Sequence, residues 1–207
     1  MKLKVNELNK VSISPSFLLL IVLCLFGGFF KRSLILLISL FFHELGHLFL
    51  IRLFKAKISS VSITGIGIFI NVSDYYKLSL LKKVLISLGG IIVNILIVLI
   101  TIYIPGVITK DLMKINIILA LFNCLPIYPL DGFQLIRHFL NCIYEEEYLN
   151  DLLSLVSMLL IAALFIIAFI YQSYGIMIIL AVLSYKTLQL RKNRNILYLK
   201  KIFHLQH

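Results

Sequence analysis

The chain has 207 residues, of which 61% are hydrophobic and 14% are charged, and its mean hydropathy is +1.04. An average soluble domain is about 45–50% apolar and about 25% charged, so this composition excludes a soluble fold and intrinsic disorder. It indicates an integral membrane protein. The net charge of +11 fits basic cytoplasmic loops beside anionic lipid better than a nucleic-acid partner. The three cysteines are odd in number and sit in or beside apolar runs, which excludes a disulfide scaffold.

Six apolar stretches meet or approach the length of about 20 residues that a membrane-spanning helix needs. They cover residues 11–30, 33–53, 84–104, 112 onward, 152–171 and 174–188. The predicted fold class is an all-α polytopic membrane protein with about six transmembrane helices. Residues 1–10 are expected to form a cytoplasmic N-terminal segment, 11–190 a single transmembrane domain and 191–207 a basic cytoplasmic tail.

The lysines and arginines predict how the chain is oriented. With an even number of spans, the two termini share a side of the membrane. If that side is the cytoplasm, nearly all of the 20 basic residues lie inside. Those left outside are Lys31, Arg32, Lys110 and Lys114. The positive-inside rule therefore predicts a multi-pass protein of the cell membrane with both termini cytoplasmic.

Residues 58–72 lie between the second and third spans and are too short to cross a membrane. Their alternating, β-branched sequence favours strands, and Gly65 and Gly67 mark a turn or bulge. We expect a short β-hairpin at the membrane face, where non-helical backbone must be covered by protein or water.

The second span contains the sequence His-Glu-Leu-Gly-His at residues 43–47. Histidines four positions apart project from one helix face, and two neutral imidazoles there can bind one Zn²⁺. Glu44 lies beside this face, placed to take a proton from a water whose pKa the metal lowers to about 7. Ionisable groups inside a span are costly and usually functional, which favours a zinc site over a polar cluster that only joins helices.

Two histidines leave a tetrahedral zinc ion one protein ligand short. Of the nine Asp and Glu residues, only Glu44 and Asp131 lie in a long apolar context. Asp131 follows two prolines that break the fourth span, and Gly132 beside it allows close approach of the backbone. Asp131 is therefore the candidate third ligand. Two alternatives stay open: Asp131 only caps the following helix, or a glutamate among residues 145–147 binds the metal.

Residues 43–47 and the Leu-Asp-Gly sequence at 130–132 together resemble the site-2 protease family of intramembrane zinc metalloproteases. The family's pattern Asn-x-x-Pro-x-x-Pro-Leu-Asp-Gly is matched by residues 123–132. In that family the aspartate of Leu-Asp-Gly is the third zinc ligand, two spans after the His-Glu-x-x-His helix. The resemblance implies zinc bound by His43, His47 and Asp131, with Glu44 catalytic.

The resemblance covers roughly residues 11–190 and includes a glycine-then-asparagine element at residues 89–94. It implies that Asn94 and Asn123 position the substrate, although a hydrogen bond between helices is an equal alternative for each. The six-span layout resembles the stage IV sporulation protein FB branch, which processes a sporulation sigma-factor precursor. That branch often carries a C-terminal nucleotide-sensing CBS domain. Only residues 189–207 follow the last predicted span, so we expect no ATP sensing through such a domain.

The predicted function is hydrolysis of a peptide bond in or near a membrane segment of a protein, such as a membrane-tethered transcription or sigma-factor precursor. The expected partners are this membrane-associated substrate, the lipid bilayer and an inhibitory membrane protein, without nucleic acid. The alternative is a non-catalytic metal-binding membrane protein or a metal transporter. A transporter usually shows internal repeats and polar residues in several spans, and the sequence shows no such repeat.

Overall fold

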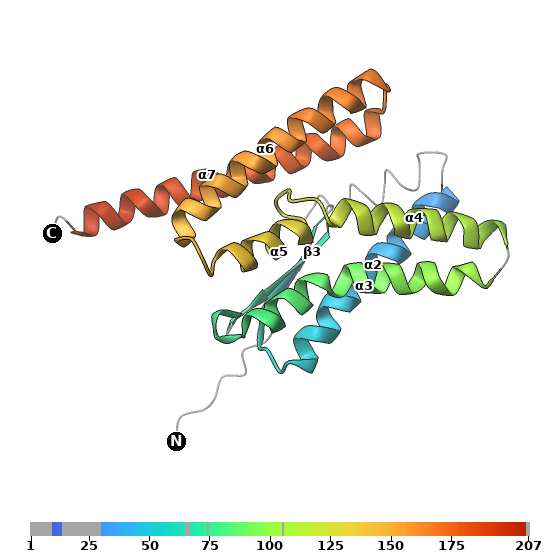
Figure 1. Ribbon diagram of the computed structural model, residues 1–207, viewed down its shortest axis with the longest axis horizontal. Coiled ribbons are helices and arrows are strands. Elements are labelled where there is room, and N and C mark those ends of the chain that lie inside the picture. Colours follow the sequence, from blue (N-terminus) through green and yellow to red (C-terminus); the bar gives the residue numbers. More distant parts are fainter. Residues whose placement is uncertain (1–9, 14–29, 65–66, 74, 105, 206–207) are drawn as a thin grey trace. The chain divides into compact units, whose positions relative to one another are not determined.

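The computed structural model describes residues 10–13, 30–64, 67–73, 75–104 and 106–205 (Figure 1). The chain forms two compact units, Met1–Phe122 and Asn123–His207. The elements of the first are β1 (Lys10–Ile13), α2 (Phe30–Leu53), β2 (Ile58–Thr64), β3 (Gly67–Val72), the 3₁₀ helix η1 (Tyr75–Lys77), α3 (Leu80–Ile102) and, up to its last residue, α4 (Val107–Asn123). Those of the second are α5 (Asp131–Leu140), α6 (Glu146–Ile170) and α7 (Tyr174–Leu205).

Within the described residues, three helices are long and apolar enough to cross a membrane. Their apolar segments are Lys31–Leu53 in α2, Leu80–Ile102 in α3 and Tyr148–Ile170 in α6. These correspond to the predicted second, third and fifth spans, and they bear out the mainly helical membrane fold.

The remaining predicted spans fare differently. The first, 11–30, is wrong at its start, because the alternating residues Val11–Ile13 belong to strand β1; residues 14–29 lie outside the described part of the chain. The fourth is divided as its prolines indicate, with α4 ending at Asn123 and α5 beginning at Asp131. The sixth is the first part of α7, which continues into the predicted tail because no proline or glycine ends it.

The predicted hairpin between the second and third spans is confirmed. Strands β2 and β3 pair antiparallel, with Ile58 opposite Val72 and Thr64 opposite Gly67. The sheet has a third strand that the sequence did not indicate: β1 pairs parallel with β2, and the order is β1-β2-β3. The hydroxyl of Ser12 donates to that of Ser62 across this pair at 2.9 Å.

Helix α2 ends in a way that directs the chain into this sheet. Lys55 adopts a positive φ of 56°, and the Ala56 amide donates to the Ile51 carbonyl at 3.0 Å. This arrangement satisfies the last carbonyls of the helix and reverses the chain direction. Strand β2 then begins at Ile58.

Helices α2 and α3 pack closely within the first unit because glycines meet where they contact (Figure 1). A Cβ atom added to Gly89 would lie 2.8 Å from the Gly46 carbonyl oxygen, and one added to Gly46 would overlap the Gly89 carbonyl. Small residues at such contacts allow backbones to approach closely in membrane helices. The close contact brings the α3 backbone against the face of α2 that carries the two histidines.

The second unit is a helical hairpin of α6 and α7 with α5 packed against α6. Its buried core consists of Phe133 from α5 with Leu149 and Leu153 from α6. Tyr128, Leu140 and Leu190 pack around these three. The aromatic ring of Phe133 therefore anchors the helix that begins at Asp131.

Candidate metal centre

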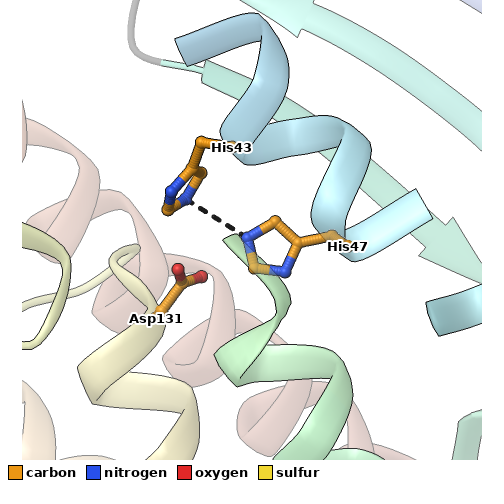
Figure 2. A group of neighbouring side chains, drawn as sticks. All are labelled: His43, His47 and Asp131. Atoms are coloured by element: carbon orange, nitrogen blue, oxygen red, sulfur yellow. Dashed lines mark hydrogen bonds between the residues drawn. The ribbon is translucent and has the colours of Figure 1, made fainter. Parts of the chain in front are cut away.

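Two histidines lie one turn apart on the buried face of α2 (Figure 2). Their side chains are 3% exposed for His43 and 9% for His47. The two Nε2 atoms face each other at 3.2 Å. The ring planes meet at 75°, with centroids 4.9 Å apart. Each imidazole therefore turns the same kind of nitrogen toward one shared point.

The outer nitrogen of His47 determines where its proton lies. His47 Nδ1 is 2.7 Å from the backbone carbonyl oxygen of Ile86 in α3. A carbonyl only accepts, so Nδ1 must carry the proton and donate it. His47 Nε2 is then left with a lone pair, which is the form of imidazole that binds a metal.

His43 is held by α3 in a similar way. Its Nδ1 lies 3.0 Å from Nδ2 of Asn94, a residue that is fully buried. Gly90 lies under the ring, since a Cβ there would overlap Cε1 and Nε2 and lie 2.6 Å from Cδ2 of His43. Both imidazoles are thus oriented by groups of the neighbouring helix, and His47 donates to a backbone carbonyl as metal-ligating histidines often do.

The spacing of the two Nε2 atoms fits a metal ion. Zinc binds imidazole nitrogen at about 2.0–2.1 Å in tetrahedral geometry, which puts two such nitrogens about 3.3–3.4 Å apart. The observed separation is 3.2 Å. The two Nε2 atoms therefore have the spacing of two ligands of one metal ion.

The predicted acid–base residue lies next to this pair. Glu44 follows His43 directly on α2, and its side chain is half-buried. Asn123, for which the resemblance implied a substrate role, is the last residue of α4 and is half-buried. Asn94 of α3, the other residue with an implied substrate role, lies against His43.

Asp131, the third labelled residue of Figure 2, lies in the first turn of α5 and is half-buried. The N-cap of this helix is Leu130, which has extended backbone. Asp131 is the first helical residue and therefore not the N-cap that the alternative required. A carboxylate in a first turn interacts favourably with the helix dipole. Gly132 is required beside it, because a Cβ there would overlap the Cys124 carbonyl and lie 2.6 Å from the Leu125 oxygen.

The loop before Asp131 is braced by hydroxyl groups that the sequence analysis missed. Ser157 of α6 lies 3.0 Å from the Pro126 carbonyl oxygen and accepts from the Tyr128 amide at 3.3 Å. Thr187 of α7 lies 3.4 Å from the Tyr128 carbonyl oxygen. Both hydroxyl residues are fully buried. Their presence within apolar helices was the only signal in the sequence.

The glutamates at 145–147 were the other candidates for a third ligand. Glu145 is exposed and occupies the N-cap position of α6, and α6 begins at the next residue. Glu145 therefore lies at the solvent-exposed start of a helix.

The comparisons with known proteins support the fold. No family model matches the sequence, and no curated protein matches it. Among solved structures, the site-2 protease from Methanocaldococcus jannaschii is similar at a TM-score of 0.68. The match covers 86% of this chain and 89% of that chain, at 17% sequence identity. The chain therefore has the fold of a site-2 protease, with helices suited to a membrane.

Proposed function

We propose that this protein is an intramembrane zinc metalloprotease of the site-2 protease type. The observation that carries the proposal is the imidazole pair of α2, with both outer nitrogens held by α3 and both Nε2 atoms 3.2 Å apart. Glu44 adjoins this pair inside a helix apolar enough to cross a membrane. A buried pair of histidines with a glutamate in such a helix is a functional arrangement by default.

The proposed metal ligands are His43, His47 and Asp131, which offer two imidazole nitrogens and a carboxylate oxygen. This donor set suits zinc, and catalytic zinc sites commonly use three protein ligands and keep one position open. Zinc, when bound, supplies Lewis acidity that polarises a scissile carbonyl and lowers the pKa of a water to about 7. Because Asp131 begins α5, its backbone position depends on the hydroxyl-braced loop before it.

Glu44 acts as the general base and acid in this proposal. Its carboxylate takes a proton from the attacking water and delivers it to the nitrogen of the leaving amine. One residue serves both steps because the proton is gained in the first and given up in the second.

The proposed substrate is a membrane-associated protein, such as the tethered precursor of a transcription or sigma factor in a sporulating cell. A helical substrate hides its backbone groups, so its cleaved segment must become extended. Strand β3 pairs with only one of the described strands, and an extended segment can add to such an edge through main-chain hydrogen bonds. An inhibitory membrane protein is a further proposed partner.

We further propose a multi-pass protein of the cell membrane with both termini cytoplasmic. The support is the distribution of basic residues, which lie mostly on the side of the termini. Arg52 follows His47 by five positions, about 7–8 Å of helix. The metal would therefore lie near the cytoplasmic end of α2, and the released fragment would enter the cytoplasm.

Co-expression with candidate tethered precursors tests this function. Cleavage is expected with the wild-type protein and not with His43→Ala or His47→Ala, because either change removes a ligand. Cleavage that survives both substitutions, in membranes shown to contain the variants, would contradict the proposal.

A further inference from the structure

Asn94 is a fully buried polar residue whose side-chain amide contacts His43. Its side chain is fully buried in α3, and Nδ2 lies 3.0 Å from His43 Nδ1. Its other end, Oδ1, is buried and has no hydrogen-bond partner among the described residues. An unpaired buried carbonyl oxygen is unfavourable, so the orientation of this amide calls for a physical explanation.

The hydrogen bonds of this group form one consistent chain of donors. Asn94 Nδ2 donates to the lone pair of His43 Nδ1, so the proton of a neutral His43 lies on Nε2. That Nε2 can donate to His47 Nε2 at 3.2 Å, and His47 Nδ1 donates to the Ile86 carbonyl. In this arrangement His43 is the wrong tautomer for a ligand, because a protonated Nε2 has no lone pair for a metal.

Binding a metal through His43 Nε2 requires the other tautomer. The imidazole must lose the proton on Nε2 and gain one on Nδ1, with no net change of charge. The Nδ1–H group then needs an acceptor, which the NH₂ end of Asn94 is not. A half-turn of the amide exchanges its ends and puts Oδ1 opposite Nδ1. The same turn gives the buried oxygen the partner that it lacks.

We propose that Asn94 is a positioning residue whose amide turns to accept from His43 Nδ1 and thereby holds His43 in its metal-binding tautomer. This inference rests on the metal site of the proposed function and assigns Asn94 to the metal ligand rather than to the substrate. Asparagine suits the role because its amide has a donor and an acceptor. It can stabilise His43 before and after the metal binds.

The structure offers a matched control for this role. Asn116 of α4 is also fully buried, and its Nδ2 donates to the Ser39 hydroxyl of α2 at 2.9 Å. Ser39 lies one turn before His43 on the same helix. Loss of the Asn116 amide therefore removes a comparable interhelical bond without touching either histidine.

The experiment measures zinc affinity of the purified full-length chain in detergent, by competition with a chromophoric chelator. Asn94→Leu keeps about the same volume but removes the acceptor, and we expect zinc affinity to fall about 10–100-fold. Asn94→Asp keeps an acceptor and cannot present an NH₂ group, so its affinity is expected to equal or exceed that of the wild type. Asn116→Leu is expected to stay within about threefold, since it leaves the ligands and their partners in place.

Three results would overturn the inference. Wild-type affinity in Asn94→Leu would show that the amide does not support His43. Equal losses in Asn94→Leu and Asn116→Leu would reduce its role to helix packing. If Asn94→Leu does not fold, Asn94→Asp decides alone, and a loss of affinity there would show that the amide is needed as a donor. His43→Ala separates the two proposals. Unchanged zinc affinity in this variant would contradict the proposed metal site itself, and not only the role of Asn94.

Discussion

Gly90→Ala tests whether the position of the His43 ring is essential. The new methyl group would overlap the imidazole and lie 2.6 Å from its Cδ2, whereas carbon atoms normally approach to about 3.5 Å. The ring must therefore retreat by roughly 1 Å. Metal–ligand distances tolerate only about 0.2 Å, so His43 cannot remain a ligand in the same geometry.

The expected result is a loss of metal and activity without loss of the fold. A misplacement of about 1 Å costs roughly 10²-fold in rate, and we expect cleavage of a co-reconstituted substrate to fall by about that factor. Alanine is favoured over glycine in a helix by about 1 kcal/mol, so α3 itself is not weakened. Zinc content, cleavage rate and the thermal unfolding midpoint, measured on the same preparation, separate these effects.

Gly175→Ala in α7 is the matched control, because a Cβ there has no atom within 4 Å. It should leave all three measurements unchanged. Gly46→Ala should instead destabilise the fold. Its methyl group would overlap the Gly89 backbone and force α2 away from α3, so we expect a lower thermal unfolding midpoint. Wild-type zinc content and cleavage in Gly90→Ala would refute the assigned ring position.

Three further changes have defined outcomes. Asp131→Ala should strip or loosen the metal, because two histidines alone hold zinc poorly, and full zinc occupancy by metal analysis would place the third ligand elsewhere. Ser157→Ala should lower the free energy of unfolding by about 1 kcal/mol through loss of the bonds to the 126–128 backbone. Ser184→Ala, which loses only a bond to its own helix, should cost less, and equal losses would contradict the bracing role. Single cysteines at Ser59 and Ser173, in a background without the native cysteines, report the orientation through an impermeant thiol reagent in intact cells. The reagent should label the cysteine at 173 and leave the one at 59 unlabelled. The reverse pattern would overturn the cytoplasmic orientation.

The parts of the fold that sequence reasoning predicted are those that depend on neighbours along the chain. Helices α2, α3 and α6 follow from hydropathy over one continuous window. The placement of His43 and His47 on one face of α2 follows from their spacing of four residues in a helix. The β2–β3 hairpin follows from alternation on both sides of two close glycines.

The parts that were missed join residues far apart in the sequence. Strand β1 pairs with β2 across about 50 residues, and four residues with a strand-like pattern are too few to reveal such a partner. The role of Gly90 depends on how α2 and α3 cross, because only that crossing brings the His43 ring over it. Ser157 and Thr187 lie against the loop before Asp131 from two later helices. Each hydroxyl also bonds to a carbonyl of its own helix, so no local pattern reveals the second contact.

Glu44→Gln tests the central claim most directly, because it changes one atom of the proposed base and none of the metal ligands. The purified variant and wild type would be reconstituted with one membrane-tethered substrate, and zinc content and cleavage rate would be measured on the same samples. The account predicts equal zinc content and a cleavage rate lower by about 10²-fold or more. Cleavage by Glu44→Gln at the wild-type rate, with zinc bound, would contradict it.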